Sequence, residues 1–404
     1  MAHHLYMEQR NSYSFDKVLE LAQQYGIYFK IVILEKNEWI FNHIDYQGVP
    51  IPFNPLCSDT DASNDPENCP GNQWFYGNGR QMTKARWLQQ AWWRYLQARW
   101  GYSTNIHSWE LLNEGDPFSG LHYTMADVFG KLMHHFIPDD HLVTTSFWHS
   151  FPKEEFWANP NYPNIDYADV HLYIGEDSQA FYDTSQATVG LSMELGANQP
   201  GGSGKPLMRG ETGFVLSDSQ PATRMFEQDN GGIWLHNFIW AGINVGGMIE
   251  SYWYETQHIY QKTAQGKVRF DYRYQYGIYY NFIKDIPLNN GDYTDAFPEV
   301  TSENLRVWGQ KDLNNGQAHL WIQNKNHTWK NVVDGVYIAP VSGMVTLRGF
   351  KAGDLYTVQW WDTYQPDPTK QIIRIENVSV QPDGSIVLRI DNLTTDLACK
   401  LAKN

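Results

Sequence analysis

The pattern of apolar and polar positions in the first three quarters of the chain predicts strands that alternate with helices. Short β-branched or aromatic runs bounded by turn residues are typical of buried parallel strands. Six such runs occur, at residues 27–34, 106–114, 141–147, 166–173, 205–213 and 246–252. Apolar stripes with helical spacing predict helices at residues 15–25, 82–100, 124–136, 178–195, 222–241 and 272–283. Strands that alternate with helices imply parallel βαβ units, so the fold class predicted here is α/β.

The pattern changes after about residue 298, where short apolar runs are separated by turn residues and no helical stripe occurs. The runs lie at residues 305–308, 318–323, 343–347, 356–361, 372–380 and 385–390. Gln-Pro-Asp-Gly at residues 381–384 predicts a hairpin turn between the last two. We therefore expect two domains, an α/β domain over residues 1–297 and an all-β sandwich over residues 298–404. If their strand is regular, Trp360 and Trp361 face opposite sides, so only one can lie in the core. The other is expected at an interface with the first domain or, less favoured, as a ligand platform.

Two of the predicted strands end on a glutamate. Glu114 follows Asn113 at the end of one run, and Glu211 follows Gly210 at the end of another. Residues at the carboxyl ends of barrel strands hold the chemistry, so these two carboxylates are expected to face one another. An isolated Asn-Glu pair would instead be read as a solvated turn. Glu110 lies inside its strand, and we expect it to be the buried partner of a cation, for which Arg209 is a candidate.

The residues around these strand ends match known motifs. Trp109, Glu110, Asn113 and Glu114 match a Trp-Glu-x-x-Asn-Glu motif, and residues 210–213 match Gly-Glu-x-Gly. His171 and Tyr173 match a His-x-Tyr strand end. In these motifs and their order the chain resembles the clan A glycoside hydrolases, the barrel group that includes the family 5 cellulases and mannanases.

The resemblance implies a (β/α)8 TIM barrel with a retaining mechanism, in which Glu114 is the acid/base and Glu211 the nucleophile. It also implies that Asn113 binds the sugar 2-hydroxyl, that Tyr173 supports the nucleophile and that Trp253 is a platform under the cleaved sugar. The alternatives are a core role for His171, a wall residue at Tyr173 and packing at Trp253. Trp148 and His149 are weaker candidates for substrate binding. Trp39, after the first strand, could line a sugar subsite, although a solvated loop fits equally well.

Composition narrows the class of partner. The 404 residues carry a net charge of -15, and 17 Trp and 25 Tyr contribute to an aromatic fraction of 15%. Acidity without a basic block argues against nucleic acid and anionic membranes as partners. Surplus aromatic rings suit an oligo- or polysaccharide substrate, although they also fill cores. No apolar run approaches about 18 residues, so no transmembrane helix is expected.

No metal or other cofactor is predicted, because no Cys/His cluster has the spacing of zinc ligands. Cys57 and Cys69 bracket a polar loop and could close a disulfide in an oxidising compartment. The first residues lack the pattern of a signal peptide, so localisation stays open. An extracellular or periplasmic location is favoured if the full-length gene carries one.

The chain departs from the family at its beginning. Counting back from the strand-4 motif makes residues 27–34 strand 3, so strands 1 and 2 have no counterpart and six βα units are visible. We therefore expect an N-terminally truncated barrel, either a fragment of a longer gene or a barrel that another segment closes. The functional alternative is a non-catalytic glycan-binding protein, against which the presence of both glutamates argues. A third alternative, a metal-dependent hydrolase, would need a His-x-His motif on an early strand, and the sequence shows no such strand. The sugar, its linkage and the choice of exo or endo action stay open.

Overall fold

The computed structural model describes residues 7–35, 84–115, 120–136, 141–147, 151–175, 182–186, 204–215, 228–244, 259–290 and 292–404. Contacts divide the chain into two compact units. The first comprises Met1–His171 with Leu195–Gly210, and the second comprises Leu172–Glu194 with Glu211–Asn404. The predicted boundary near residue 298 divides the chain differently and stays a prediction.

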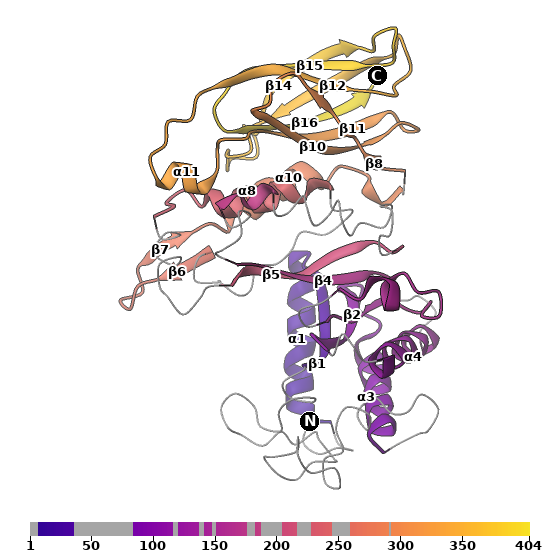
Figure 1. The fold of residues 1–404 in the computed structure, drawn as a ribbon. Helices are drawn as coiled ribbons and strands as arrows, with labels where there is room; N and C mark the ends of the chain where they lie inside the picture. The colour runs from indigo at the N-terminus through magenta and orange to yellow at the C-terminus, as the bar shows by residue number, and fades with distance from the viewer. Residues whose placement is uncertain are drawn as a thin grey trace. The chain divides into compact units, whose positions relative to one another are not determined.

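A parallel sheet of three strands lies in the first unit (Figure 1). The strands are β1 (Phe29–Glu35), β2 (Ile106–Asn113) and β3 (Leu142–Thr144), in the order β1-β2-β3. In their register Lys30 pairs with Ser108, and Glu110 pairs with Val32 on one side and Thr144 on the other. Because side chains alternate along a strand, Lys30, Glu110 and Thr144 share one face of this sheet.

Three helices of 17 residues each pack in the first unit: α1 (Gln9–Tyr25), α3 (Lys84–Trp100) and α4 (Gly120–Phe136). Helices α1 and α3 meet through Phe15 and Trp100, whose rings lie edge to face at 4.9 Å. Helix α1 begins earlier than predicted, because the Glu8 carboxylate accepts the Asn11 N–H at 2.5 Å and caps it. It ends at Gly26, which has a left-handed φ of 65°.

Strands β4 (Ala168–Gly175) and β5 (Leu207–Val215) pair in a two-stranded sheet. The division between the two units runs through both strands, after His171 and after Gly210. Before β4, the π-helix η2 (Lys153–Trp157) buries Phe156 and Trp157 against Phe147, at ring distances of 5.3 and 5.5 Å. This aromatic packing lies just beyond the end of β3.

The second unit contains short helices and a hairpin in addition to its C-terminal strands. The helical segments are α8 (Ile233–Trp240), η3 (Ala241–Asn244), α10 (Tyr274–Ile283), η4 (Leu288–Asn290) and α11 (Trp329–Val333). The hairpin pairs β6 (Tyr260–Lys262) with β7 (Val268–Asp271). Every residue of α8 is buried, and Asp229 accepts the Trp234 N–H at 3.0 Å in its first turn.

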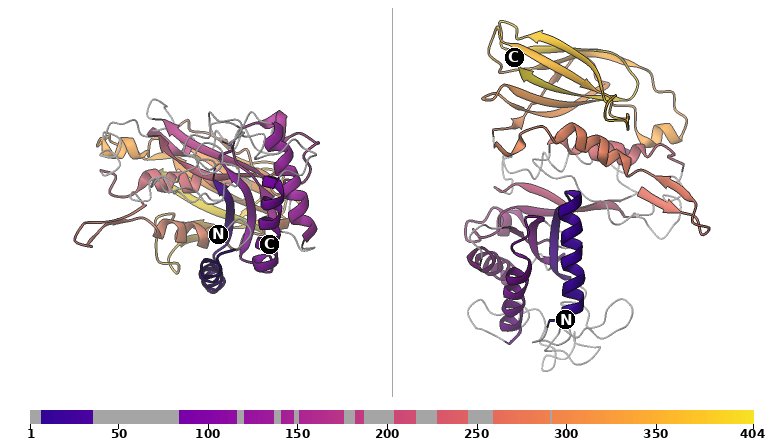
Figure 2. Two further views of the ribbon diagram at one scale, coloured as in Figure 1. Left: turned by 90° about the horizontal axis from the view of Figure 1, so that it is seen from below. Right: turned by 180° about the vertical axis from the view of Figure 1, so that it is seen from behind.

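Nine strands form two antiparallel sheets after residue 293 (Figure 2, orange to yellow). The larger sheet has the order β14-β13-β16-β11-β10-β8 and the smaller has the order β15-β12-β9. The strands are β8 (Thr294–Asp295), β9 (Glu299–Val300), β10 (Leu305–Asp312), β11 (Gln317–Asn324), β12 (Val341–Leu347), β13 (Leu355–Trp361), β14 (Ile372–Ser379), β15 (Ile386–Leu393) and β16 (Asp396–Lys403).

The six-stranded sheet buries side chains on both faces. On one face Leu320, Val358 and Trp360 join residues of the smaller sheet in a common core. On the other face Trp321 and Trp361 join a core that includes residues of α8 and α10. The predicted opposite orientation of Trp360 and Trp361 is therefore confirmed, but the expectation that only one of them lies in a core is wrong, because both are buried. Trp361 meets Phe282 of α10 at 5.5 Å.

One prediction for the C-terminal part is wrong, and some of its elements were missed. Residues 381–384 do form a turn, with Gly384 N–H donating to Gln381 O at 2.9 Å, but it is not a hairpin turn. It joins β14 to β15, which pair with β13 and β12 in different sheets. Strand β16 and helix α11 were not predicted, because β16 mixes Lys and Asp into its apolar pattern and α11 is too short for a helical stripe.

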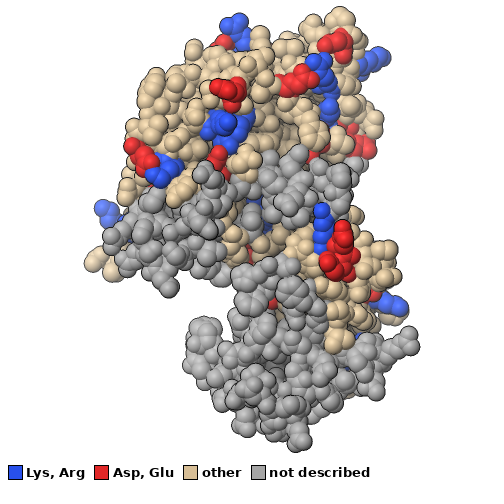
Figure 3. Space-filling view, in the orientation of Figure 1, with Lys and Arg blue, Asp and Glu red and all other residues tan. Residues whose placement is uncertain are grey.

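The described parallel strands fit the predicted α/β class, and the antiparallel sheets fit the predicted all-β part. Closure into a barrel and its truncation stay predictions. The predicted strand at residues 246–252 and most of the predicted helix at 178–195 lie outside the described residues. None of the helices described here is long and apolar enough to cross a membrane. On the surface that Figure 3 shows, acidic and basic side chains lie next to one another in several places.

Candidate active site

Glu114 follows the last residue of β2 and has an unusual backbone. Its φ is 51°, in the left-handed region that few residues other than glycine adopt. Its N–H donates to Ser146 Oγ at 2.8 Å, and the next N–H, of Gly115, donates to Ser146 O at 3.0 Å. Gly115 cannot be replaced easily, because a Cβ there would overlap the His122 ring. Hydrogen bonds to Ser146 and the close packing of Gly115 on His122 therefore hold the strained backbone of Glu114.

The side chain of Glu114 pairs with His171, in the first unit. Glu114 Oε1 lies 3.0 Å from His171 Nδ1, and the two side chains are 14% and 2% exposed. On the opposite side of the ring, His171 Nε2 lies 4.0 Å from Asp169 Oδ1. A hydrogen bond between an imidazole and a carboxyl group can be made with the proton on either partner. The pair is thus suited to a glutamate that gives up and regains a proton.

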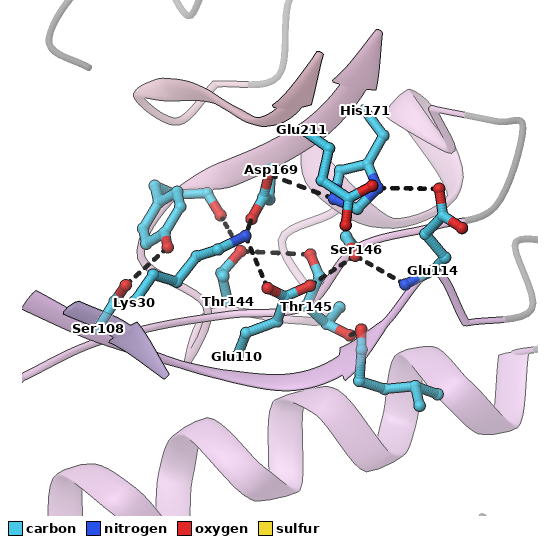
Figure 4. Close-up of polar contacts among 12 residues, drawn as sticks. Lys30, Ser108, Glu110, Glu114, Thr144, Thr145, Ser146, Asp169, His171 and Glu211 are labelled. Carbon is cyan, nitrogen blue, oxygen red and sulfur yellow. Dashed lines mark hydrogen bonds and ion pairs between the residues drawn. The ribbon is translucent and has the colours of Figure 1, made fainter. Parts of the chain in front are cut away.

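A buried ammonium lies beneath this pair (Figure 4). Lys30 Nζ lies 2.6 Å from Asp169 Oδ2 and 2.7 Å from Glu110 Oε2, and both carboxylates are fully buried. Ser146 Oγ donates to Glu110 Oε1 at 2.5 Å and accepts the Glu114 N–H. Polar contacts therefore run from Lys30 through Glu110 and Ser146 to the Glu114 backbone, and from Lys30 through Asp169 and His171 to the Glu114 side chain.

Burial and charge act in opposite directions on this cluster. Burial alone would lower the pKa of Lys30, but Asp169 and Glu110 outweigh it and raise the pKa above the usual lysine range. Burial raises the pKa of Asp169, and Lys30 only partly offsets this effect. Lys30 is therefore firmly protonated, and it compensates the charge of the carboxylates.

Gly210 and Glu211 are adjacent on β5 and have different surroundings. A Cβ at Gly210 would overlap Asp169 and lie against Lys30, so the glycine of the Gly-Glu motif is required by the buried cluster. Glu211 belongs to the second unit, where the Tyr173 hydroxyl donates to its Oε2 at 2.6 Å. Tyr173 was expected to support Glu211, and this hydrogen bond provides the contact.

The arrangement also bears on metal binding. Glu110, Asp169 and His171 offer ligand atoms within 4.8 Å of one another, which is the spacing of a metal site. The Lys30 ammonium is bonded to both carboxylates of this group. A metal ion there would have to displace Lys30 or tolerate its charge, so these residues fit a buried ion cluster better than a metal centre.

The predicted site residues are only partly described. Asn113 is the last residue of β2, is partly buried and pairs in register with Glu35. Glu110 is buried beside a cation as predicted, and Lys30 supplies that cation; Arg209, the predicted partner, is fully buried as well. Six residues of the sequence-based predictions lie outside the described part of the chain: Trp39, Trp148, His149, Trp253, Cys57 and Cys69.

Sequence reasoning missed Lys30, Ser146 and Asp169. Two of them carried a signal, because Lys30 and Asp169 are charged residues inside runs predicted to be buried strands. A buried charge requires a partner, so these two could have been paired with Glu110. Ser146 gave no signal, since a serine at the end of a strand is common.

Comparison with known proteins finds solved structures that resemble this chain at low sequence identity. No family model and no curated protein sequence match the chain. A candidate glycoside hydrolase from Bacteroides vulgatus has a TM-score of 0.49 and 12% identity, over 96% of this chain and 62% of that protein. A bifunctional glucanase-xylanase from a metagenome library has a TM-score of 0.45 and 12% identity, over 97% and 85%. An endo-β-1,4-mannanase from Thermotoga petrophila has a TM-score of 0.39 and 12% identity, over 93% and 75%. Likeness of this size does not establish a common fold or activity.

Proposed function

We propose that this protein is a retaining glycoside hydrolase that cleaves β-linked glycosidic bonds by double displacement. Glu114 is the acid/base and Glu211 the nucleophile. One observation carries the proposal: strand β4 supplies a hydrogen-bond partner to each of these carboxyl groups, His171 to Glu114 and Tyr173 to Glu211.

The roles follow from the surroundings of each carboxyl group. Glu114 protonates the leaving oxygen while Glu211 attacks the anomeric carbon, and Glu114 then deprotonates the water that releases the sugar. His171 can share the proton of Glu114 between these steps. The Tyr173 hydroxyl donates to one oxygen of Glu211 and so orients the carboxylate that attacks. Retaining enzymes need the two carboxyl groups about 5 to 5.5 Å apart, and this is a requirement of the proposal.

The backbone of Glu114 also supports a functional role. A glutamate with a φ of 51° costs free energy, and strained residues persist chiefly where the surroundings force them, often at active sites. Here Ser146, Gly115 and the buried Lys30 cluster maintain that conformation. The proposed substrate is an oligo- or polysaccharide. Asn113, at the end of β2, is the proposed partner of the sugar 2-hydroxyl, a contact that strengthens in the transition state.

The test is hydrolysis of a panel of aryl β-glycosides by the purified full chain and its Glu114→Ala and Glu211→Ala variants. We expect Glu211→Ala to abolish turnover. We expect Glu114→Ala to lower kcat/KM by about 10² to 10⁴ for poor leaving groups and less for activated ones. Azide should rescue Glu114→Ala and give a glycosyl azide of retained configuration. Glu303→Ala, at an exposed glutamate, is the control and should match the wild type.

Two results would contradict the proposal. An azide product of inverted configuration from Glu114→Ala would exclude the double displacement. A folded wild type that hydrolyses no glycoside yet binds oligosaccharides would show a glycan-binding protein instead.

A further inference from the structure

The six-stranded sheet of the second unit has a polar region on the face that is elsewhere covered by α8 and α10. In register, Lys400 of β16 lies between Gln359 of β13 and His319 of β11. The next row on the same face holds Thr357, Ala402 and Gln317. The adjacent part of this face, with Trp321 and Trp361, is buried in the apolar core. The polar rows instead border an open pocket.

The pocket has a volume of about 390 Å³, within the usual range for small-molecule sites. Every lining residue belongs to the second unit. Its polar side chains come from three strands and from the segment after α10, and they are Gln317, Thr357, Gln359, Lys400, Tyr293 and Asp285. Its apolar walls include Ile286, Pro287, Trp361 and Ile372. Polar groups and apolar walls thus lie around one cavity.

The ammonium of Lys400 contacts rings. Its Nζ lies 4.6 Å from the centre of the Trp361 ring and 5.1 Å from that of Phe282. Within the part of the chain that the structure describes, it makes no ion pair and no hydrogen bond. Burial lowers the pKa of Lys400 to about 8. A half-buried ammonium with unused donors is costly, and a ligand that supplies acceptor oxygens would relieve that cost.

The charges of the pocket favour a neutral ligand over an anion. Lys400 is a cationic donor and Asp285 an anionic acceptor, and the Gln359 amide can both donate and accept. Gln317 Oε1 already accepts the Tyr293 hydroxyl at 2.6 Å, so the Gln317 amide contributes chiefly its N–H donors. A sugar hydroxyl also donates and accepts, so neighbouring hydroxyls can satisfy both kinds of group. The C–H faces of a sugar ring suit the apolar walls. An anion would face Asp285 and a chain of net charge -15.

We propose that this pocket is a binding site for one or two residues of a neutral saccharide, made of residues other than the proposed catalytic glutamates. Lys400 donates to ring or hydroxyl oxygens, and Gln359 and Gln317 bind adjacent hydroxyls. The inference does not depend on the proposed hydrolysis, since the pocket can bind sugar whether or not the chain cleaves it.

The experiment is a binding titration of full-length protein carrying Glu211→Gln, so that no ligand is hydrolysed. The probes are methyl β-glucoside, methyl β-mannoside, cellobiose, mannobiose and xylobiose. Saturation-transfer NMR and calorimetry measure their binding. We expect at least one to bind, and we expect Lys400→Met and Gln359→Leu each to weaken that binding about tenfold. Lys403→Met is the matched control, because Lys403 lies on the same strand and pairs with Asp354 outside the pocket. It should leave the affinity unchanged.

Failure of this inference differs from failure of the proposed function. If no probe binds, or if binding is equally strong in folded Lys400→Met and Gln359→Leu, the pocket is not a saccharide site, while the hydrolysis assays still decide the catalytic roles. Thermal unfolding of each variant establishes that it is folded. If only glucuronate, as a charged comparison, binds through Lys400, then the neutral class is wrong.

Discussion

The two units each bury a charged cluster, and the clusters differ in where their hydrogen bonds lead. In the first unit, Lys30 is bonded to Glu110 and Asp169, and contacts continue through Ser146 and His171 to Glu114. In the second unit, Asp396 of β16 accepts from His236 at 3.0 Å, from Trp321 at 2.8 Å and from Thr363 at 2.6 Å.

The second cluster joins structural elements and does not lead to either of the two glutamates proposed to be catalytic. His236 lies on α8 and Trp321 on β11, so Asp396 fixes the six-stranded sheet to the helix beneath it. Tyr364 stacks on His236 at 3.9 Å and covers the cluster. Burial and ionisation are common to both clusters, so neither identifies an active site. Only the first network leads to a residue of the proposed catalytic pair, Glu114.

The largest effect is expected from Lys30→Met. The substitution removes the cation and leaves Glu110 and Asp169 buried without it, so the first unit should lose about 3 to 5 kcal/mol of unfolding free energy. Denaturant unfolding measures the loss of unfolding free energy, and hydrogen exchange in β1 and β2 locates it in the first unit. Lys17→Met removes an exposed pair with Glu20 and should change the stability far less, because water and salt screen exposed pairs. Equal effects of the two substitutions would contradict the importance of the buried cluster.

A smaller and pH-dependent effect is expected from Asp396→Asn. Burial would raise the pKa of Asp396, but His236, Thr363 and Trp321 outweigh it and hold the pKa below the usual aspartate value. The folded pKa is lower than the unfolded one, so this carboxylate stabilises the protein above about pH 4 and loses that contribution as the pH falls through its folded pKa.

Asp396→Asn should therefore cost about 2 kcal/mol near neutral pH and progressively less as the pH falls below about 4. Unfolding of the second unit, measured at several pH values, gives the difference from the wild type. Hydrolysis of a small aryl glycoside by the folded variant should stay at the wild-type rate. Asp391→Asn, in an exposed pair with Arg389, is the control and should show no such pH dependence. A difference that is independent of pH would exclude the charge as its source.

The smallest effect on stability is expected from Ser146→Ala, but it should affect catalysis. The hydroxyl joins Glu110 to the Glu114 N–H, and its loss should cost about 1 to 2 kcal/mol of stability. Because Ser146 positions Glu114, kcat should fall while KM stays unchanged, and Ser146→Thr should restore kcat. Ser12→Ala, which removes another buried hydroxyl bonded to Tyr95, should lower stability without changing kcat. A Ser146→Ala enzyme with wild-type kcat would show that the contact is only structural.

The elements were more predictable than the contacts between them. Apolar runs located β1, β2 and β4, because buried parallel strands need such runs on both faces. The motif at residues 109–114 located Glu114, yet its left-handed backbone could not be read from the sequence, since glutamate rarely adopts that conformation. Lys30 carried a signal as a charge inside a buried run, but its partners Glu110 and Asp169 come from strands far apart in the sequence, so the contacts themselves could be seen only in the fold. The error at residues 381–384 has the same origin, because a turn does not specify which strands pair.

The positive φ of Glu114 has a consequence for how this position can change during evolution. Asparagine and glycine adopt a left-handed backbone more readily than glutamate does. Replacing Glu114 by either residue should therefore relieve backbone strain of about 1 to 2 kcal/mol. Selection for stability alone would therefore remove the carboxyl group from this strand end. A glutamate at this position therefore opposes the preference of its own backbone, and under the proposed function a substitution that stabilised the fold here would remove the acid/base.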